Sequence, residues 1–346
     1  MIPKNTAPST DPDKYRPISL LNYMGKIFAK LIKNRLVQHF EINNTIRETQ
    51  HGFRKRRGTT TLLANLYERI AREKGTDRRT LITMVTRDVQ KAFDKVWHEA
   101  IIYKLIRVRV NQKMVRLITN FLQSRKAYVK VNKHKGETFN LKAGVPQGDV
   151  LSPTLFLILA NDFPEPTRSN QQRNFAMQYA DDFTQVIISK FPTTLTQAAR
   201  DTHKINMEDE IQKQNDYKNK WKIKTNLSKF TIINIGTYKA PIIVVQNTSI
   251  PYVNQTKLLG THITRNNFYV KQIEYNINRV RAELKKLNRF RLLKTKLKVR
   301  LYKALILLLL TYPVVPINIC SETQIKKLQV IQNNAIRWIT NESTRT

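Results

Sequence analysis

The sequence predicts an α+β protein in which a region of mixed helices and strands precedes a region that is almost entirely helical. Three observations lead to this expectation. Short runs rich in β-branched and other apolar residues alternate with stretches whose apolar residues recur at helical spacing. Two such runs flank a tight turn at Asp181-Asp182, as in a hairpin. Near residue 265 the composition changes, and the chain beyond it is strongly basic and helical in pattern.

The individual elements follow from the same patterns, taken in chain order. Residues 1–14 carry three prolines and are expected to be extended or looped. Pro153 suits the first turn of a helix, where its missing N–H has no intrahelical partner. Helices are expected over residues 20–40, 59–74, 100–121, 152–160, 193–222 and from 269 onward. Strands are expected over residues 80–89, 127–131, 138–141, 175–179, 183–188, 229–235 and 242–245, with a further short strand within 255–263.

The charge of the chain predicts a polyanionic partner. Lys and Arg total 61 against 25 acidic residues, a formal net charge of +36 over 346 residues. For a protein with no membrane segment, an excess this large favours nucleic acid. The alternative is a basic surface that serves only solubility or packing. Charge alone says nothing about chemistry.

Cysteine content and hydropathy exclude two other classes. Cys320 is the single cysteine, so neither an internal disulfide framework nor a Cys-rich zinc site can form, and a reducing, intracellular setting is expected. The most apolar stretch, residues 304–310, is far shorter than the roughly 20 residues that a membrane span needs. We therefore expect a buried helix there and no membrane role.

Three carboxylates could support phosphoryl transfer. Asp88 ends the strand-like run 80–89, and Asp181-Asp182 lie between two further strands. Two-metal chemistry needs hard oxygen ligands held on rigid neighbouring elements. Because neighbouring strand residues point to opposite faces, Asp181 is expected to bind metal with Asp88 most directly, and Asp182 to play a different part. The alternative for Asp181-Asp182 is ordinary turn chemistry.

Short motifs accompany these carboxylates in a fixed order. They are Ile2–Lys4 with Tyr15–Leu21, His51–Arg54 with Gly58–Thr60, Asp88–Trp97, Gly144–Pro153, Tyr179–Asp182, Asn226–Lys229 and Lys257–Gly260. In this order the set resembles the motifs of reverse transcriptases, and it is most similar to those of non-LTR (LINE-like) retrotransposons of the jockey type. Any one motif is weak, whereas the ordered set spans nearly the whole chain.

The resemblance implies a fold and a reaction. The fold would be a right-hand polymerase with N-terminal fingers at 1–80, a palm on an antiparallel sheet with inserted fingers and helical segments at 81–264, and a helical, truncated thumb-like region at 265–346. The reaction would be RNA-directed DNA synthesis, in which nucleotidyl transfer from a dNTP to a primer 3′-hydroxyl uses two Mg²⁺ ions, with Mn²⁺ as a substitute. RNA template, DNA primer and dNTPs would be the partners.

The resemblance also implies a setting inside cells. The chain would act in a nuclear or cytoplasmic ribonucleoprotein as a fragment of a longer element protein. No stretch of it resembles an endonuclease or a Cys/His knuckle, so alone it should not cut its own target.

Roles at the reaction centre are carried over from the matching positions. Asp88, Asp181 and Asp182 would bind metal, and Lys229 would donate a proton to the departing pyrophosphate. Lys4 and Arg16 would contact the triphosphate, since ammonium and guanidinium groups both suit phosphate oxygens. For these three basic residues the alternative is a solvated surface.

Further positions would contact the sugar and the nucleic acid. Phe93 would lie beneath the sugar and exclude a 2′-hydroxyl, or simply pack in the core. Gln147, in a Gly-Val-Pro-Gln-Gly turn, would support the nucleotide and template. The residues expected to contact template or primer are Arg54, Lys55, Arg56, Arg57, Lys257, Leu258 and Gly260.

Three departures from the family pattern keep other hypotheses open. Arg87 stands where an apolar residue is usual, and its side chain would enter a packed layer. Asp149 replaces a small neutral residue, and Leu227–Phe230 match their motif loosely. Besides an active polymerase, the chain could be an inactive, RNA-binding relic or an RNA-dependent RNA polymerase. Phe93 argues against the last, because a ribonucleotide needs room for its 2′-hydroxyl.

Overall fold

The computed structural model describes most of the chain. The described residues are 2–3, 10–76, 79–123, 125–131, 134–192, 195–236, 243–245, 248–250, 252–265, 270–312 and 320–342. The helices are α1 (Tyr23–Ile42), α2 (Thr59–Thr76), α3 (His98–Arg107), α4 (Gln112–Leu122), α5 (Ser152–Ala160), α6 (Gln197–Lys220), α7 (Val270–Leu287), α8 (Thr295–Leu301), α9 (Leu307–Thr311) and α10 (Glu322–Thr340). The strands are β1 (Ile2–Pro3), β2 (Tyr15–Arg16), β3 (Thr80–Asp88), β4 (Arg125–Val131), β5 (His134–Leu141), β6 (Phe175–Tyr179), β7 (Asp182–Lys190), β8 (Thr231–Ile235), β9 (Ile243–Val245), β10 (Thr248–Ile250), β11 (Gln255–Leu258) and β12 (Thr261–Thr264).

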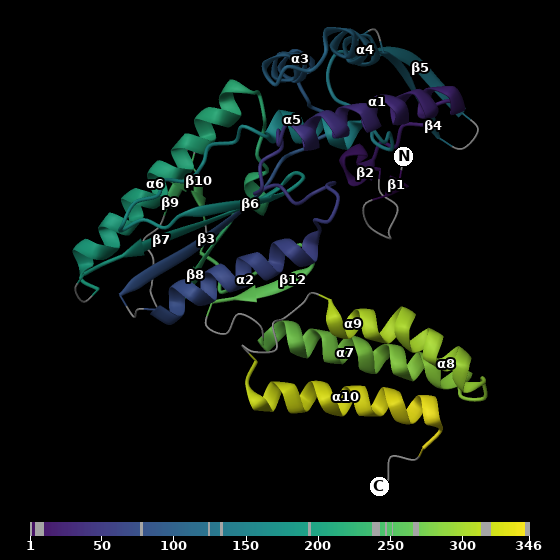
Figure 1. The fold of residues 1–346 in the computed structure, drawn as a ribbon, viewed down its shortest axis with the longest axis vertical. Coiled ribbons are helices and arrows are strands. Elements are labelled where there is room, and N and C mark those ends of the chain that lie inside the picture. Colours follow the sequence, from purple (N-terminus) through teal and green to yellow (C-terminus); the bar gives the residue numbers. More distant parts are fainter. Residues whose placement is uncertain are drawn as a thin grey trace.

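A four-stranded antiparallel sheet lies at the centre of the molecule (Figure 1). Its strand order is β6-β7-β3-β8, and β3 pairs with β7 along its full length, from Thr80 opposite Lys190 to Asp88 opposite Asp182. These strands are rich in β-branched residues, which suit a pleated, buried surface. The predicted α+β class and the antiparallel sheet are confirmed.

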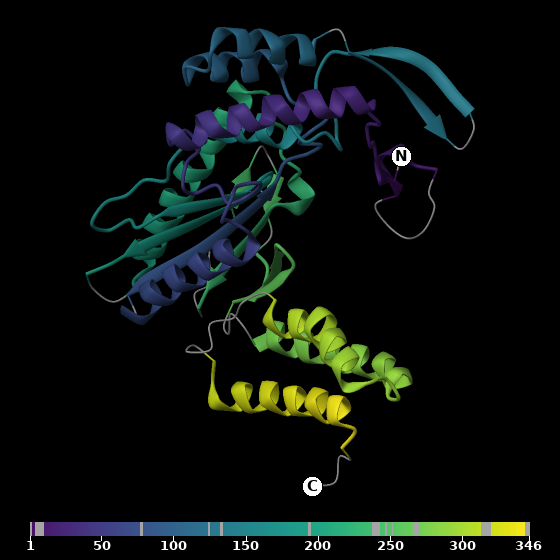
Figure 2. The same cartoon turned by 45° about the vertical axis from the view of Figure 1, so that its right-hand side comes forward.

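Helices cover both faces of this sheet, because alternate residues of the strands are apolar on each side. In β3, Ile82 and Met84 join a buried cluster with Leu63 and Leu66 of α2. Val85 faces the other way and packs with Met207 and its neighbours on α6. Figures 1 and 2 show α2 and α6 on opposite sides of the sheet. The sheet is therefore rigid where its strands end.

A second helical group, α1, α3, α4 and α5, lies at one end of the sheet (Figure 1). Helix α5 is its centre, with every residue from Leu155 to Ala160 buried. The expected single helix over 100–121 is in fact two helices. Arg109 takes a positive φ of 57°, and the Asn111 side chain accepts a hydrogen bond from the Lys113 N–H to begin α4.

The last group, α7 to α10, has its own buried cluster around Ile277, Val280 and Ile331. Residues 304–310 are helical as expected, but they are not a buried helix. Ile306 is fully buried, whereas Leu305 and Leu308 are 42% and 60% exposed, because this short segment contacts the cluster along one side only. No helix within the described part of the chain is long and apolar enough to span a membrane.

Candidate active site

The three carboxylates predicted from the sequence meet at one end of the central sheet. Asp88 is the last residue of β3 and Asp182 the first of β7, and their Cα atoms are register partners. Directly opposed residues of antiparallel strands share a face and are near neighbours. Asp181 lies beside them in the β6–β7 turn. The register thus opposes Asp182, rather than Asp181, to Asp88.

The turn that carries Asp181 is held by residues far away in sequence. Ala180 has a positive φ of 56°, and its N–H donates to Gln50 Oε1 at 3.0 Å. The same oxygen accepts from the Gly52 N–H at 2.8 Å. A Cβ at Gly52 would lie 2.4 Å from Ala180 N, so only glycine fits this approach. Sequence analysis assigned Gln50 no role, although it directly precedes the His-Gly-Phe-Arg motif.

The carboxylates repel one another electrostatically. Burial, followed by the charges of Asp181 and Asp88, raises the pKa of Asp182 to about 6. Burial also raises the pKa of Asp181, with Asp88 adding to the effect and Lys229 and Arg16 opposing it. Such a site disfavours further negative charge and favours a cation.

Lys229 already supplies one positive charge to this site. It ends a 3₁₀ turn over Leu227–Lys229, where the sequence suggested the start of a strand. Its ammonium pairs with Asp88 Oδ2, and this hydrogen bond raises the pKa of Lys229. The Asn226 N–H donates to the Asp88 carbonyl at 3.0 Å, which holds the turn against the end of β3.

The carboxylate set suits divalent ions by its chemistry. Asp88, Asp181 and Asp182 offer hard oxygen ligands, and the Lys229 ammonium stands where Asp88 would otherwise meet a metal cation. Among the residues that the structure describes, no three His, Cys, Asp or Glu side chains are arranged to hold an ion together. Metal binding would therefore require the carboxylates to reorient and Lys229 to leave Asp88.

Two predicted nucleotide-contacting motifs pack against each other near the carboxylates. Gln147 Nε2 donates to Asp94 Oδ1 at 2.7 Å, and the Val145 N–H donates to the Phe93 carbonyl at 2.7 Å. Gly144 has a positive φ of 83°, and a Cβ there would lie 2.5 Å from the Asp94 carbonyl oxygen. The glycine is required because the two loops come so close.

Phe93 and Arg16 approach the same region from different segments. The half-buried Phe93 ring lies 5.4 Å from the Phe156 ring, centroid to centroid, so it packs in the core and is not fully covered. The Ser19 N–H donates to the Gln147 carbonyl at 2.8 Å. This bond ties the segment after β2 to the Gln147 loop, and the exposed Arg16 lowers the pKa of Asp181. Lys4 lies outside the described residues.

The basic run at 54–57 divides into two pairs. Arg54 donates to the Arg47 carbonyl at 2.8 Å, and Arg57 donates to the Glu48 carbonyl at 2.6 Å. These two guanidiniums hold the local backbone, whereas Lys55 and Arg56 are exposed.

The β11–β12 hairpin carries the other predicted contacts with nucleic acid. Lys257 and Gly260 are exposed, but the Leu258 side chain is only 5% exposed and belongs to the core.

Arg87 lies in the packed layer that its position predicted. The side chain is 4% exposed and faces α6, and none of its three guanidinium nitrogens has a hydrogen-bond partner within the described residues. Its Cζ lies 4.8 Å from the centre of the Phe230 ring. Burial lowers the pKa of Arg87 to about 9, with partial compensation from Glu210.

Asp149, the other departure, has a local structural role. Its Oδ1 accepts a hydrogen bond from the Leu151 N–H at 2.6 Å, one residue before α5 begins. A carboxylate at a helix N-terminus is favoured by the helix dipole.

Comparison with known proteins identifies what this arrangement is similar to. A family model described as reverse transcriptase (RNA-dependent DNA polymerase) matches residues 2–263. The RNA-directed DNA polymerase from mobile element jockey of Drosophila funebris is 28% identical over 98% of this chain and 37% of its own length. The probable RNA-directed DNA polymerase from transposon X-element of Drosophila melanogaster is also 28% identical, over the same shares. The chain thus spans little more than a third of these relatives.

Among solved structures, apo telomerase from Candida tropicalis aligns with 91% of this chain and 55% of its own. The TM-score is 0.47 at 11% identity, a likeness too weak to bear on function.

Proposed function

Because the chain belongs to the reverse transcriptase (RNA-dependent DNA polymerase) family, we propose that it is the polymerase unit of a non-LTR retrotransposon protein and synthesises DNA on an RNA template. The observation that carries this proposal is the register of β3 and β7, which opposes Asp88 to Asp182 beside the Asp181 turn. We assign the central sheet to the palm (81–264), the N-terminal segment (1–80) to the fingers and the helices after 265 to the thumb.

The three carboxylates would hold two divalent ions, Mg²⁺ or Mn²⁺. When bound, the ions would activate the primer 3′-hydroxyl for attack on the α-phosphate of a dNTP and hold the triphosphate. The rigid ends of β3 and β7 fix the positions of Asp88 and Asp182, since small errors in reacting geometry are expensive. Burial keeps water away and strengthens each charge at the site.

The basic residues at this end of the sheet would serve the triphosphate. Lys229, released from Asp88, would donate a proton to the departing pyrophosphate. The exposed Arg16 would grip phosphate oxygens with its fork of N–H donors. Lys4 would add a further positive charge.

The Phe93 side would govern the choice of sugar. Phe93 is fixed against Phe156 and has part of its ring exposed. A ring in that place would collide with a 2′-hydroxyl, so deoxynucleotides would be selected. Gln147, held by Asp94, would support the base pair being formed.

The template and primer would run over exposed basic surfaces. Lys55 and Arg56 would contact template phosphates, while Arg54 and Arg57 shape the loop that carries them. Lys257 and the Leu258–Gly260 turn would support the primer strand. A ribonucleoprotein in the nucleus or cytoplasm would be the working form.

Primer extension tests this proposal. On poly(rA)/oligo(dT) with Mg²⁺, the wild-type chain should incorporate dTTP, and Asp181→Asn should lose at least about 100-fold in rate, as expected when a reacting centre loses a key charge. Asp209→Asn, an exposed carboxylate on α6, is the matched control and should keep the wild-type rate. Incorporation of rNTPs as readily as dNTPs would remove the reverse-transcriptase assignment.

One observation favours a second candidate, an inactive RNA-binding relic. Arg87 is buried beside Asp88 without a hydrogen-bond partner among the described residues, a strain that an active enzyme has reason to avoid. A folded protein that binds poly(rA)/oligo(dT) but incorporates no dTTP would establish the relic and exclude the polymerase.

A further inference from the structure

Two adjoining cavities lined by arginines lie beside α2, away from the carboxylates. The first has a volume of about 280 Å³ and is lined by Arg69, Arg72, Arg168 and Arg173. The second, of about 340 Å³, shares Arg69 and Arg168 and adds Arg57. Every Lys or Arg that lines either cavity is an arginine, in a chain that also has many lysines.

Two of these arginines have no acidic partner. Arg173 pairs with Glu73 at 3.4 Å and Arg72 with Glu68 at 2.7 Å. For Arg69 and Arg168, by contrast, the described part of the chain provides no side-chain hydrogen bond or ion pair. The two cavities therefore share a pair of guanidiniums whose charge nothing nearby neutralises.

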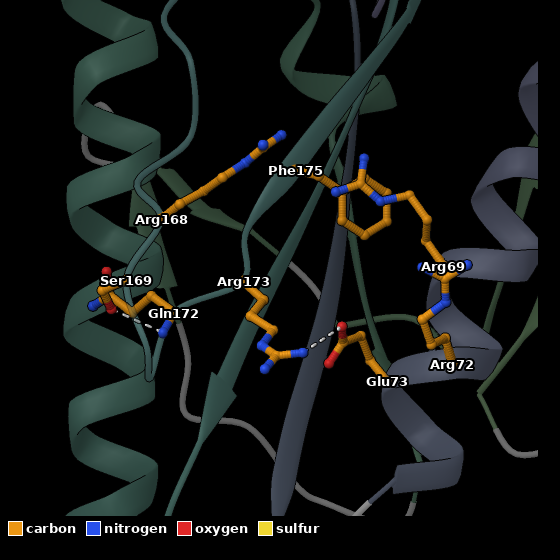
Figure 3. A pocket seen from close by; sticks show the side chains of 8 residues that line it. All are labelled: Arg69, Arg72, Glu73, Arg168, Ser169, Gln172, Arg173 and Phe175. Carbon is orange, nitrogen blue, oxygen red and sulfur yellow. Dashed lines mark hydrogen bonds and ion pairs between the residues drawn. The ribbon is translucent and has the colours of Figure 1, made fainter.

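The uncompensated pair face each other across the shared space. Figure 3 shows the Arg69 guanidinium lying across the Phe175 ring, with the Arg168 side chain extending toward it from the loop before β6. Arg69 Cζ is 3.8 Å from the ring centre. Burial, and then the charge of Arg168, lowers the pKa of Arg69. An anion between them would relieve this repulsion.

The cavities are remote from the reaction centre. Gln172, which lines the first cavity, forms a bridge with Ser189 of β7. Ser189 is seven residues along the strand from Asp182. At about 3.3 Å per residue the separation is roughly 20 Å. The arginines therefore cannot contact a nucleotide at the carboxylates.

We propose that the two cavities form a second nucleic-acid site, which binds successive phosphates of a single-stranded RNA segment. Arginine forks bind phosphate oxygens through two parallel hydrogen bonds, which lysine cannot do. Two joined cavities with shared arginines suit a chain of phosphates better than one small anion. The guanidinium of Arg69, braced by Phe175, offers a flat surface on which a base can stack.

RNA binding with the catalytic end occupied tests this site. The full chain is saturated with a short RNA/DNA hybrid, and the affinity for a fluorescent single-stranded RNA is then measured against salt. The Arg72→Gln/Arg168→Gln variant should bind about 10-fold more weakly, since hydrogen bonds to charged groups are worth about 1.5–3 kcal/mol each. Its log–log salt slope should fall by about one.

Two further variants sharpen the reading. Arg107→Gln/Arg116→Gln removes the same charge from exposed positions on α3 and α4, and should leave both quantities unchanged. Arg168→Lys keeps the charge and loses the fork, so it should weaken binding to an intermediate degree.

The outcomes separate this site from the polymerase. Weaker RNA binding by Arg72→Gln/Arg168→Gln, with unchanged extension of the short hybrid and an unchanged unfolding temperature, supports the proposal. Equal RNA binding by this variant, the wild type and the control variant overturns it. Displacement of the RNA by low concentrations of tripolyphosphate also overturns it, in favour of a small polyphosphate ligand. A wild-type chain that incorporates no dTTP leaves the RNA-binding result interpretable by itself.

Discussion

Replacing Arg87 with methionine should stabilise the protein. The guanidinium is 4% exposed, and all three of its nitrogens lack a hydrogen-bond partner among the described residues. Methionine has a similar length, is flexible enough to fill the space and needs no partner. Buried ionic groups have been replaced by apolar residues of similar volume with gains of about 1–4 kcal/mol.

The structure sets the size of the effect. Burial lowers the pKa of Arg87 from its ordinary value of 12.5 to about 9. At about 1.4 kcal/mol per pKa unit, this difference of about 3.5 corresponds to roughly 5 kcal/mol of destabilisation of the charged form. The Phe230 ring, 4.8 Å away, returns about 2 kcal/mol. We expect Arg87→Met to raise the free energy of unfolding by about 3 kcal/mol.

Urea denaturation followed by far-UV circular dichroism measures this quantity. The midpoint should move to higher urea with an unchanged slope. Arg107→Met, at an exposed position on α3, should stay within about 0.5 kcal/mol of the wild type. A lower free energy of unfolding for Arg87→Met would refute the reasoning, because it would mean that the guanidinium stabilises the layer it occupies.

Three further predictions concern the sugar, the turn and pH. Phe93→Val should increase rNTP incorporation relative to dNTP at least about 10-fold, measured by competing the two in one extension assay; an unchanged ratio would leave Phe93 with packing alone. Gly52→Ala should lower the extension rate strongly, because the new Cβ would meet Ala180 N at 2.4 Å; a wild-type rate would show that the turn tolerates a shift. Burial lowers the pKa of His203 to about 4, below its ordinary 6.5. Its contribution to stability is therefore complete above pH 6.5 and is lost as pH falls toward 4, by up to about 3 kcal/mol. Unfolding of His203→Gln, measured at both ends of that range, should depend less on pH than that of the wild type, and equal dependence would contradict this assignment.

Local patterns predicted the elements that depend on near neighbours in sequence. Helix α5 begins and ends at the expected residues because Pro153 sits in its first turn and an apolar run follows. The β6 and β7 strands around Asp181 were likewise clear, since alternating burial and a tight turn both act over a few residues. The break between α3 and α4 was missed, because one residue of positive φ and one cap residue interrupt an otherwise continuous helical pattern.

Contacts between distant segments could not be read from periodicity. Gln50 reaches Ala180 across 130 residues. Arg69 and Arg168 are likewise far apart in sequence and meet only because α2 and the loop before β6 cover the same end of the sheet. Both depend on tertiary packing and leave no repeating signal. The carboxylates were found because their motif is short and local, whereas the pairing of Asp88 with Asp182 required the strand register.

The central claim is that the carboxylates opposed across β3 and β7 run DNA synthesis on RNA. The most direct measurement counts pyrophosphate released and dTMP incorporated in the same reaction on poly(rA)/oligo(dT) with Mg²⁺. The wild-type chain should release one pyrophosphate for each dTMP, and Asp182→Asn should produce neither while still binding the hybrid. A wild-type chain that binds the hybrid and produces neither, or an Asp182→Asn variant as fast as the wild type, would contradict the claim.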